Sequence, residues 1–106
     1  MLPQVTSLYQ SPSSDSTRES FTPLLQSEQL LLEQIVSHGQ ASPQGFWYDQ
    51  PRPEWVALLR GSARLQFDDG ELALAAGDAL LIAAHCRHRV AECSTDAIWL
   101  ALHFQA

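Results

Sequence analysis

Three residues in this sequence combine reactive side chains with positions that look internal. His88 lies in a short alternating stretch that ends at Glu92, and His103 lies in the apolar run 97–104. Imidazole can take or give a proton near neutral pH, and it can also ligate a metal ion. Glu54 opens the stretch EWVALL, where period-two alternation places it on the same strand face as Val56 and Leu58. A carboxylate in line with core residues indicates a polar cavity rather than a solvated surface.

Other polar groups lie close to these residues in the sequence. Tyr48, Asp49 and Gln50 precede Glu54 and offer a phenol, a carboxylate and an amide. His85 and His88 form the pattern H-x-x-H. On an extended strand that odd offset sends them to different faces, although a turn between them would let them converge. Both arrangements remain open at this point.

The elements that must position these residues are short strands. Residues 63–68 alternate cleanly between apolar and polar, and Asp69-Gly70 is a strong hairpin-turn signal because glycine accepts the positive φ of such turns. We expect further strands over 46–49, 54–59, 71–75, 79–83, 88–92 and 97–104, with 79–83 buried on both faces. Strands at this spacing, separated by turn residues, predict an all-β sandwich or barrel.

The segment 24–36 (LLQSEQLLLEQIV) is ambiguous, because its leucines fit either a helical stripe or an alternating strand. We expect a short helical turn near 24–29, followed by a strand over about 31–37. Residues 1–20 are rich in serine and have little to bury, so they predict a flexible N-terminal arm. Residues 21–106 then form the single folded domain.

Composition excludes several classes of partner. The net charge is −6, and the six basic residues are all arginine, which argues against nucleic acid. No run of eighteen apolar residues is present, so we expect no membrane span. The N-terminus lacks the pattern of a secretory signal. With only two cysteines, roughly 23 Å apart if they share a strand, we expect reduced thiols and a cytoplasmic protein.

Two stretches resemble the sequence motifs of the cupin superfamily. Glu54, six residues and then Gly61 match the end of the first cupin motif. Gly77 opens the second motif, in which Ala83 stands in the proline place, His85 in the glycine place and His88 in the histidine place. The two histidines of the first motif are missing, and Glu92 replaces the final asparagine. The resemblance covers about two-thirds of the chain, and the fifteen residues between Gly61 and Gly77 are the short separation typical of small bacterial cupins.

The resemblance implies a double-stranded β-helix, or jelly-roll barrel, in which Glu54 and His88 approach each other inside. In metal-binding cupins these positions join two further histidines on one divalent transition metal. Here those two positions fall on Trp47 and Asp49, or on Tyr48 and Gln50. A carboxylate-rich metal set of Asp49, Glu54 and His88 is therefore one possibility. The other is a cavity without metal that binds its ligand through polar side chains.

Three hypotheses follow from the sequence. The first is a cupin that binds an unidentified small molecule in a polar cavity lined by Tyr48, Gln50, Glu54, His88 and His103. The alternative is a metal-dependent cupin enzyme, an oxygenase or isomerase, that uses Asp49, Glu54 and His88. The third is a structural protein without ligand. In each case we expect a homodimer, because open sheets leave unpaired edge strands, and we expect residues 24–37 to contribute to its interface.

Overall fold

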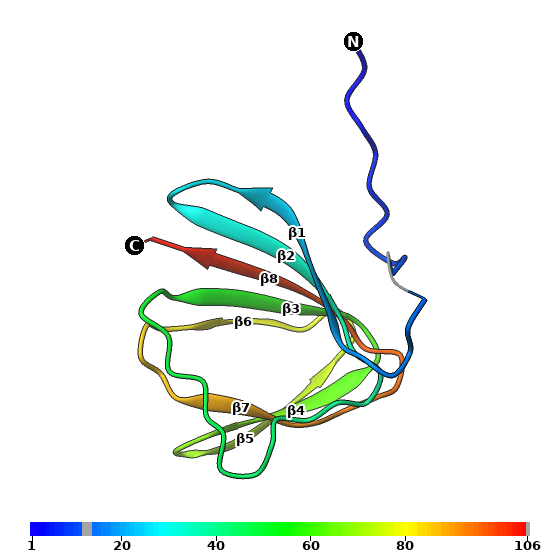
Figure 1. Cartoon of the computed structure of the whole chain (residues 1–106). Coiled ribbons are helices and arrows are strands. Elements are labelled where there is room, and N and C mark those ends of the chain that lie inside the picture. Colours follow the sequence, from blue (N-terminus) through cyan, green and yellow to red (C-terminus); the bar gives the residue numbers. More distant parts are fainter. Residues whose placement is uncertain (12–13, 106) are drawn as a thin grey trace.

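The computed structural model, which describes residues 1–11 and 14–105, consists of eight antiparallel strands in two facing sheets (Figure 1). The strands are β1 (Ser20–Gln26), β2 (Leu30–Val36), β3 (Glu54–Arg60), β4 (Ser62–Phe67), β5 (Gly70–Ala75), β6 (Ala79–Ile82), β7 (His88–Cys93) and β8 (Ile98–Phe104). The first sheet has the order β1-β2-β8-β3-β6, and the second has the order β5-β4-β7. This architecture confirms the predicted all-β jelly roll.

The helical turn predicted near residues 24–29 is wrong. The chain stays extended to Gln26 and then turns through residues 27–29 into β2, and no helix occurs among residues 1–11 and 14–105. The leucines that suggested a helical stripe pair across this hairpin instead, with Leu25 opposite Leu32. Cross-strand pairing thus accounts for a spacing that sequence periodicity assigns equally well to a helix.

Two smaller strand predictions also need correction. Residues 46–49 form no strand, only an isolated bridge between Tyr48 and His88. β6 is not buried on both faces, because it lies at the edge of the first sheet, and Leu81 is 60% exposed. β6 is therefore an edge strand with one exposed face, although its sequence is an apolar run.

The hydrophobic core fills the space between the two sheets. Leu58 of β3 and Ala63 and Leu65 of β4 are almost fully buried and contact a cluster that includes Trp99 of β8. Along β4, Ala63 and Leu65 alternate with less buried polar residues, which confirms the period-two pattern predicted for 63–68. The same alternation turns Glu54 inward, two positions before Val56. One end of the sandwich interior is therefore apolar, and the other end holds polar side chains.

Two residues with positive φ shape the connections. Gly61 joins β3 to β4 at φ 88°, and a Cβ there would collide with the Ser94 hydroxyl and lie 2.9 Å from Asp96 Oδ1. His85, before β7, has φ 60°, which non-glycine residues adopt infrequently. Cupins place glycine at the position of His85, and the backbone conformation explains that preference.

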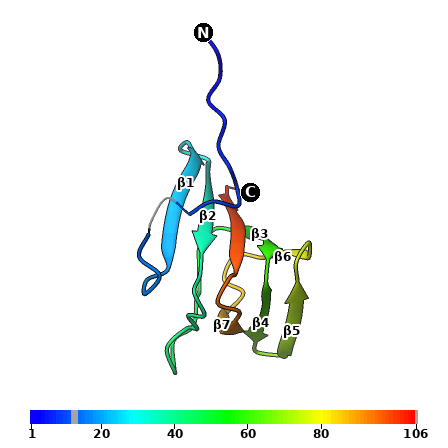
Figure 2. The ribbon, with the colours of Figure 1, turned by 90° about the vertical axis from the view of Figure 1, so that its right-hand side faces the viewer.

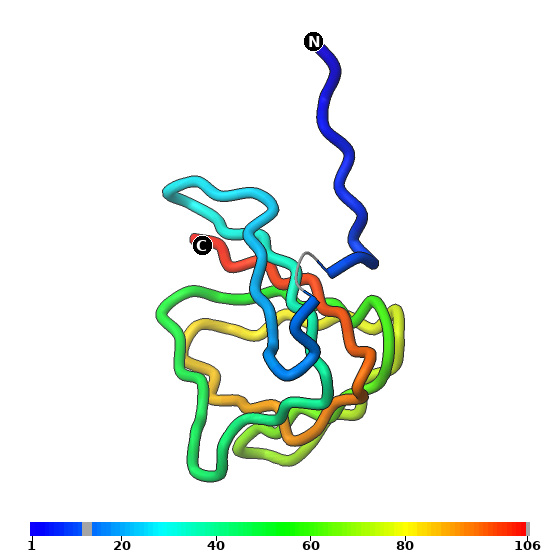
Figure 3. The backbone as a smooth tube through the Cα atoms, turned by 45° about the vertical axis from the view of Figure 1, so that its right-hand side comes forward, coloured from blue at the N-terminus to red at the C-terminus, as the bar shows by residue number. Residues whose placement is uncertain are grey.

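A long connection, residues 37–53, leaves β2, crosses to the second sheet and returns to β3 (Figure 3). Ser42 pairs with Val90 of β7 through N–H···O bonds of 2.9 and 3.0 Å. Tyr48 exchanges backbone hydrogen bonds with His88, also in β7. This connection therefore closes one side of the polar end of the sandwich.

The outer edge of the first sheet is irregular. Its edge strand β1 contains Pro23, and the pairing register with β2 shifts between Pro23 and Leu25. The N-terminal end of the chain extends away from the two sheets (Figure 2), whereas Leu8 and Gln10 accept hydrogen bonds from Gln34 of β2. Cys86 and Cys93 are both free thiols. In the described residues, no helix is long and apolar enough to cross a membrane.

Candidate functional site

A cavity of about 180 Å³ lies at the polar end of the sandwich, between the two sheets and the connection 37–53. Its polar lining includes three carboxylates, two imidazoles, a phenol, two amides and a hydroxyl, with apolar and aromatic side chains between them. The polar lining residues are Glu19, Glu33, Gln40, Ser42, Tyr48, Gln50, Glu54, His88 and His103. Pockets that hold drug-sized ligands are typically about 300–1,000 Å³, so this cavity fits a smaller molecule.

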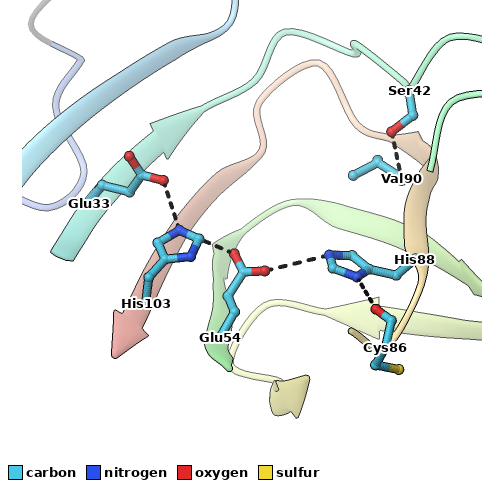
Figure 4. Close-up of polar contacts among 7 residues, drawn as sticks. All are labelled: Glu33, Ser42, Glu54, Cys86, His88, Val90 and His103. Atoms are coloured by element: carbon cyan, nitrogen blue, oxygen red, sulfur yellow. Dashed lines mark hydrogen bonds and ion pairs between the residues drawn. The ribbon is translucent and has the colours of Figure 1, made fainter. Parts of the chain in front are cut away.

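Four of these side chains form a continuous chain of alternating carboxylates and imidazoles (Figure 4). Glu33 Oε1 lies 3.2 Å from Nε2 of His103, and the same nitrogen lies 3.6 Å from Glu54 Oε2. The other oxygen of Glu54 lies 3.5 Å from Nε2 of His88. The side chains of Glu54 and His88 are 11% and 7% exposed, so their contact is shielded from water.

Strand register brings these groups together. Glu54 is directly opposite His103 in the β3–β8 pair, and Glu33 lies opposite Ala101 in the β2–β8 pair, two positions from His103 on the same face. His88 comes from the other sheet and faces Glu54 across the cavity. Each side chain therefore points inward because it alternates with neighbours on the outer face of its strand.

The ring of His88 is held in one orientation. Its Nδ1 lies 2.9 Å from the backbone carbonyl oxygen of Cys86, which can only accept, so Nδ1 carries the donated proton. Nε2 is left facing Glu54. Tyr48 stacks on the ring at 5.3 Å between centroids, and Phe67 lies at 6.1 Å on a tilted plane. A fixed ring whose second nitrogen faces a carboxylate can accept or release a proton at Nε2.

Electrostatics in the cavity favour protonated imidazoles. Burial acts to lower the pKa of His88, but hydrogen bonds to Glu54 and to the Cys86 carbonyl, with the charge of Glu54, raise that pKa above its ordinary value. The pKa of His103 is raised mainly by its hydrogen bond with Glu33, against the effect of burial. The pKa of the Tyr48 phenol is raised by burial first and then by nearby carboxylates. The cavity is therefore negative in character.

The structure places all five predicted ligand-binding residues, Tyr48, Gln50, Glu54, His88 and His103, in the cavity lining. It places Asp49 elsewhere. Asp49 Oδ1 is 2.7 Å from Nδ1 of His85, and both side chains are more than half exposed. The predicted metal set of Asp49, Glu54 and His88 is therefore not assembled. The physical reason is alternation, because Tyr48 and Gln50 turn inward and Asp49 between them turns outward.

Sequence reasoning missed two lining carboxylates, Glu33 and Glu19. Glu33 could have been found by the argument used for Glu54, since it shares one strand face with the apolar residues Leu31 and Ile35. Glu19 had no such signal, because it precedes β1 in a polar stretch. In the structure Glu19 Oε2 accepts a short hydrogen bond from the Ser37 hydroxyl, which draws it to the cavity.

A divalent metal ion is the cofactor that cupins often carry, and the donor types here suit one, because two imidazoles and a carboxylate are common ligands of transition metals. Their arrangement does not. The Glu54 carboxylate lies between the two imidazoles and presents a different oxygen to each. Within the described part of the chain, no three His, Cys, Asp or Glu side chains are grouped as metal ligands. As they lie, these residues form carboxylate–imidazole pairs rather than a metal centre.

Comparisons with known proteins agree with this architecture. Residues 33–103 match the family model described as "Cupin domain". No curated protein matches the chain. Among solved structures, a protein of Ralstonia eutropha JMP134, provisionally described as a mannose-6-phosphate isomerase, is 41% identical, with a TM-score of 0.86 over 98% of this chain and 100% of that one.

Two further structures share the fold at lower identity. A cupin superfamily protein of Desulfitobacterium hafniense DCB-2 is 19% identical, with a TM-score of 0.77 over 99% of this chain and 95% of its own. An RmlC-like cupin of Desulfovibrio desulfuricans is 17% identical, with a TM-score of 0.72 over 97% of each chain. At these identities the likeness concerns the fold alone.

Proposed function

The chain belongs to the cupin domain family, and we propose that it binds a small uncharged or cationic molecule in the cavity around Glu54. The observation that carries this proposal is the chain of alternating groups Glu33, His103, Glu54 and His88. It offers both hydrogen-bond donors and acceptors within a cavity of about 180 Å³. Polar groups that converge in a small, partly apolar pocket are typical of ligand sites.

The charge of the lining supports this choice of ligand class. Three carboxylates face two imidazoles, so the lining stays negative even when both imidazoles are protonated. The lining includes no arginine, and the sequence has no lysine. Phe46, Tyr48 and Trp99 add aromatic faces, which attract cations. An anionic ligand would therefore find no cationic partner except the two histidines.

A second candidate function is an isomerase, which corresponds to the description of the Ralstonia protein. The observation that favours it is the pair of imidazoles on one carboxylate, because isomerisation requires groups that remove and return protons. The acidic lining argues against a phosphorylated substrate, since bound phosphate groups are usually held by arginine, lysine or backbone N–H groups. The cupin barrel supports many different reactions, so the fold alone does not decide between the two candidate functions.

A set of probes matched in size separates these functions. Ethanolamine, ethylene glycol and glycolate are two-carbon molecules with charges of +1, 0 and −1. We expect ethanolamine to shift the NMR signals of His88 and His103 at the lowest concentration and glycolate at the highest. In Glu54→Gln the preference for ethanolamine should disappear.

Strongest binding of glycolate would contradict the proposed ligand class. Conversion of mannose 6-phosphate to its ketose isomer, lost in Glu54→Gln, would instead establish the second candidate. The exposed substitution Glu71→Gln, in an ion pair with Arg64 outside the cavity, serves as the control in both experiments.

A further inference from the structure

A second groove, distinct from the cavity around Glu54, lies between the edges of the two sheets. β5 is an edge strand of the smaller sheet and β6 is an edge strand of the larger one, and both lie on the same side of the molecule (Figure 2). The groove between them has a volume of about 600 Å³, and of the described residues only Ile82 lines both it and the cavity. Its volume is within the range of ligand-binding pockets.

The floor of this groove is apolar and open to solvent. Leu72 of β5 is opposite Leu65 of the buried core, so Leu72 points toward the interior of the sandwich. It is nevertheless 49% exposed, whereas Leu74, the next residue on the same strand face, is buried. Leu80 of β6 is opposite the core residue Val56, and it also lines the groove. An inward-pointing leucine that stays half exposed indicates a space that another chain can fill.

The edge of β5 carries backbone groups that can pair with such a chain. In an antiparallel pair, the N–H and C=O groups of alternate residues point away from the neighbouring strand. Ala75 is one of these residues, because its N–H and C=O groups both bond to Asp78. By alternation, the groups of Glu71 and Ala73 also point away from β4. Within residues 1–11 and 14–105, no hydrogen bond reaches them on that side, and β5 contains no proline.

The charges along the groove are mostly acidic. Three carboxylates and one guanidinium line it, those of Asp68, Asp69, Glu71 and Arg87. The Arg87 guanidinium lies 3.6 Å from Asp68 and 4.7 Å from the centre of the Trp47 ring, so it is already engaged. Asp69 has no ion-pair partner among the described residues. A second copy of this chain, with a net charge of −6, matches this groove poorly, whereas a basic segment matches it well.

We propose that this groove binds an extended segment of a partner protein in which apolar and basic residues alternate. The segment pairs with Glu71 and Ala73 and becomes the fourth strand of the smaller sheet. Because side chains alternate along a strand, its apolar residues fill the space over Leu72 and Leu80, and its basic residues lie on the other face, toward the acidic side of β5. Backbone pairing supplies affinity in this mode of recognition, and the alternating side chains supply specificity.

Amide hydrogen exchange, followed by NMR, tests this proposal with a hexapeptide in which lysine and valine alternate. Saturating peptide should slow exchange at Glu71 and Ala73 at least tenfold, because their N–H groups gain acceptors. The amides of Leu72 and Leu74 already pair with β4 and should change less. Two control peptides should bind at least tenfold more weakly. In one, glutamate replaces lysine, and in the other every backbone nitrogen is methylated, which keeps the side chains and removes the donors.

Two substitutions in the protein separate backbone pairing from charge. Ala73→Pro removes a free N–H group without removing a bond of the β4–β5 ladder, and Asp69→Lys reverses the unpaired charge. Each should weaken binding of the lysine–valine peptide at least tenfold, whereas Glu28→Lys, in the exposed turn between β1 and β2, should not. Circular dichroism checks the fold, and the methylated peptide and Asp69→Lys still decide the matter if Ala73→Pro does not fold.

Three results would overturn the proposal. One is unchanged exchange at Glu71 and Ala73 in millimolar lysine–valine peptide. Another is equal affinity for the three peptides, or for Asp69→Lys and the wild type. The third is a dimer of this chain that Ala73→Pro dissociates in light scattering, because the β5 edge would then belong to a second copy.

Discussion

Replacement of Glu54 by glutamine tests the central electrostatic feature of the cavity. The substitution keeps the size of the side chain, removes its charge and replaces one acceptor oxygen by an NH2 donor. Glu54 faces His88 at 3.5 Å and His103 at 3.6 Å, so one change removes a carboxylate that both imidazoles share, while His103 keeps Glu33 at 3.2 Å. We expect the pKa of His88 to fall below its ordinary value, because burial then acts without the opposing effect of the carboxylate.

The effect on stability depends on pH with a definite sign. In the wild type the pKa of His88 is raised in the folded state, so its stabilising contribution is fully present below the unfolded pKa of about 6.5 and is lost as pH rises through the folded value. His103 contributes with the same sign. A hydrogen bond to a charged group contributes about 1.5–3 kcal/mol. Glu54→Gln should therefore lower the free energy of unfolding by about 2 kcal/mol at pH 5.5 and by much less at pH 8.5.

Urea unfolding across this pH range, together with NMR titration of both histidines, measures the effect. Glu71→Gln is again the control, because its ion pair with Arg64 is exposed and should contribute little to stability. A stability difference that stays constant from pH 5.5 to 8.5 would refute this reasoning. So would an unchanged pKa of His88 in Glu54→Gln.

Three further outcomes are expected. Glu33→Gln should lower the pKa of His103, which depends first on its hydrogen bond with Glu33, and NMR titration should show a smaller change at His88. Gly61→Ala should lower the free energy of unfolding in urea by about 3 kcal/mol, because the new Cβ is strained at positive φ and also collides with its neighbours. Gly45→Ala should cost about 1–2 kcal/mol, because Gly45 has positive φ but open space around it. Equal losses in the two variants would contradict the role of the collision. Leu58→Ala should cost about 2–5 kcal/mol because Leu58 is fully buried, and a loss under 1 kcal/mol would place it outside the core.

Much of the fold could be predicted from local patterns. The alternation over 63–68 and the turn signal at Asp69-Gly70 predict the β4–β5 hairpin, because both are local properties. The turn itself lies one residue earlier than predicted, at Asp68 and Asp69, and Gly70 opens β5 opposite Phe67. Residues 24–29 could not be assigned in this way. Their extended conformation depends on pairing of Leu25 with Leu32 across the hairpin, which periodicity along the chain does not encode.

The candidate site also has residues that local patterns could predict and residues that depend on long-range contacts. Glu54 and His88 could be placed inside because each alternates with apolar residues on one strand, and the structure agrees. Asp49 could not be placed, because alternation alone does not say whether Asp49 or its neighbours Tyr48 and Gln50 turn inward. The bridge of Tyr48 to His88 and the contact of Asp49 with His85 decide this. The inward direction of Glu33 could have been predicted from its strand face, but its contact with His103 follows from the register of β2 against β8.

The irregular edge at Pro23 has a consequence for the behaviour of the protein at high concentration. An edge strand with a regular row of free N–H and C=O groups invites another chain to extend the sheet, and repeated extension produces fibres. Pro23 lacks an N–H group, and the register shift beside it interrupts that row. Growth of the first sheet into an open-ended ribbon through β1 is therefore obstructed.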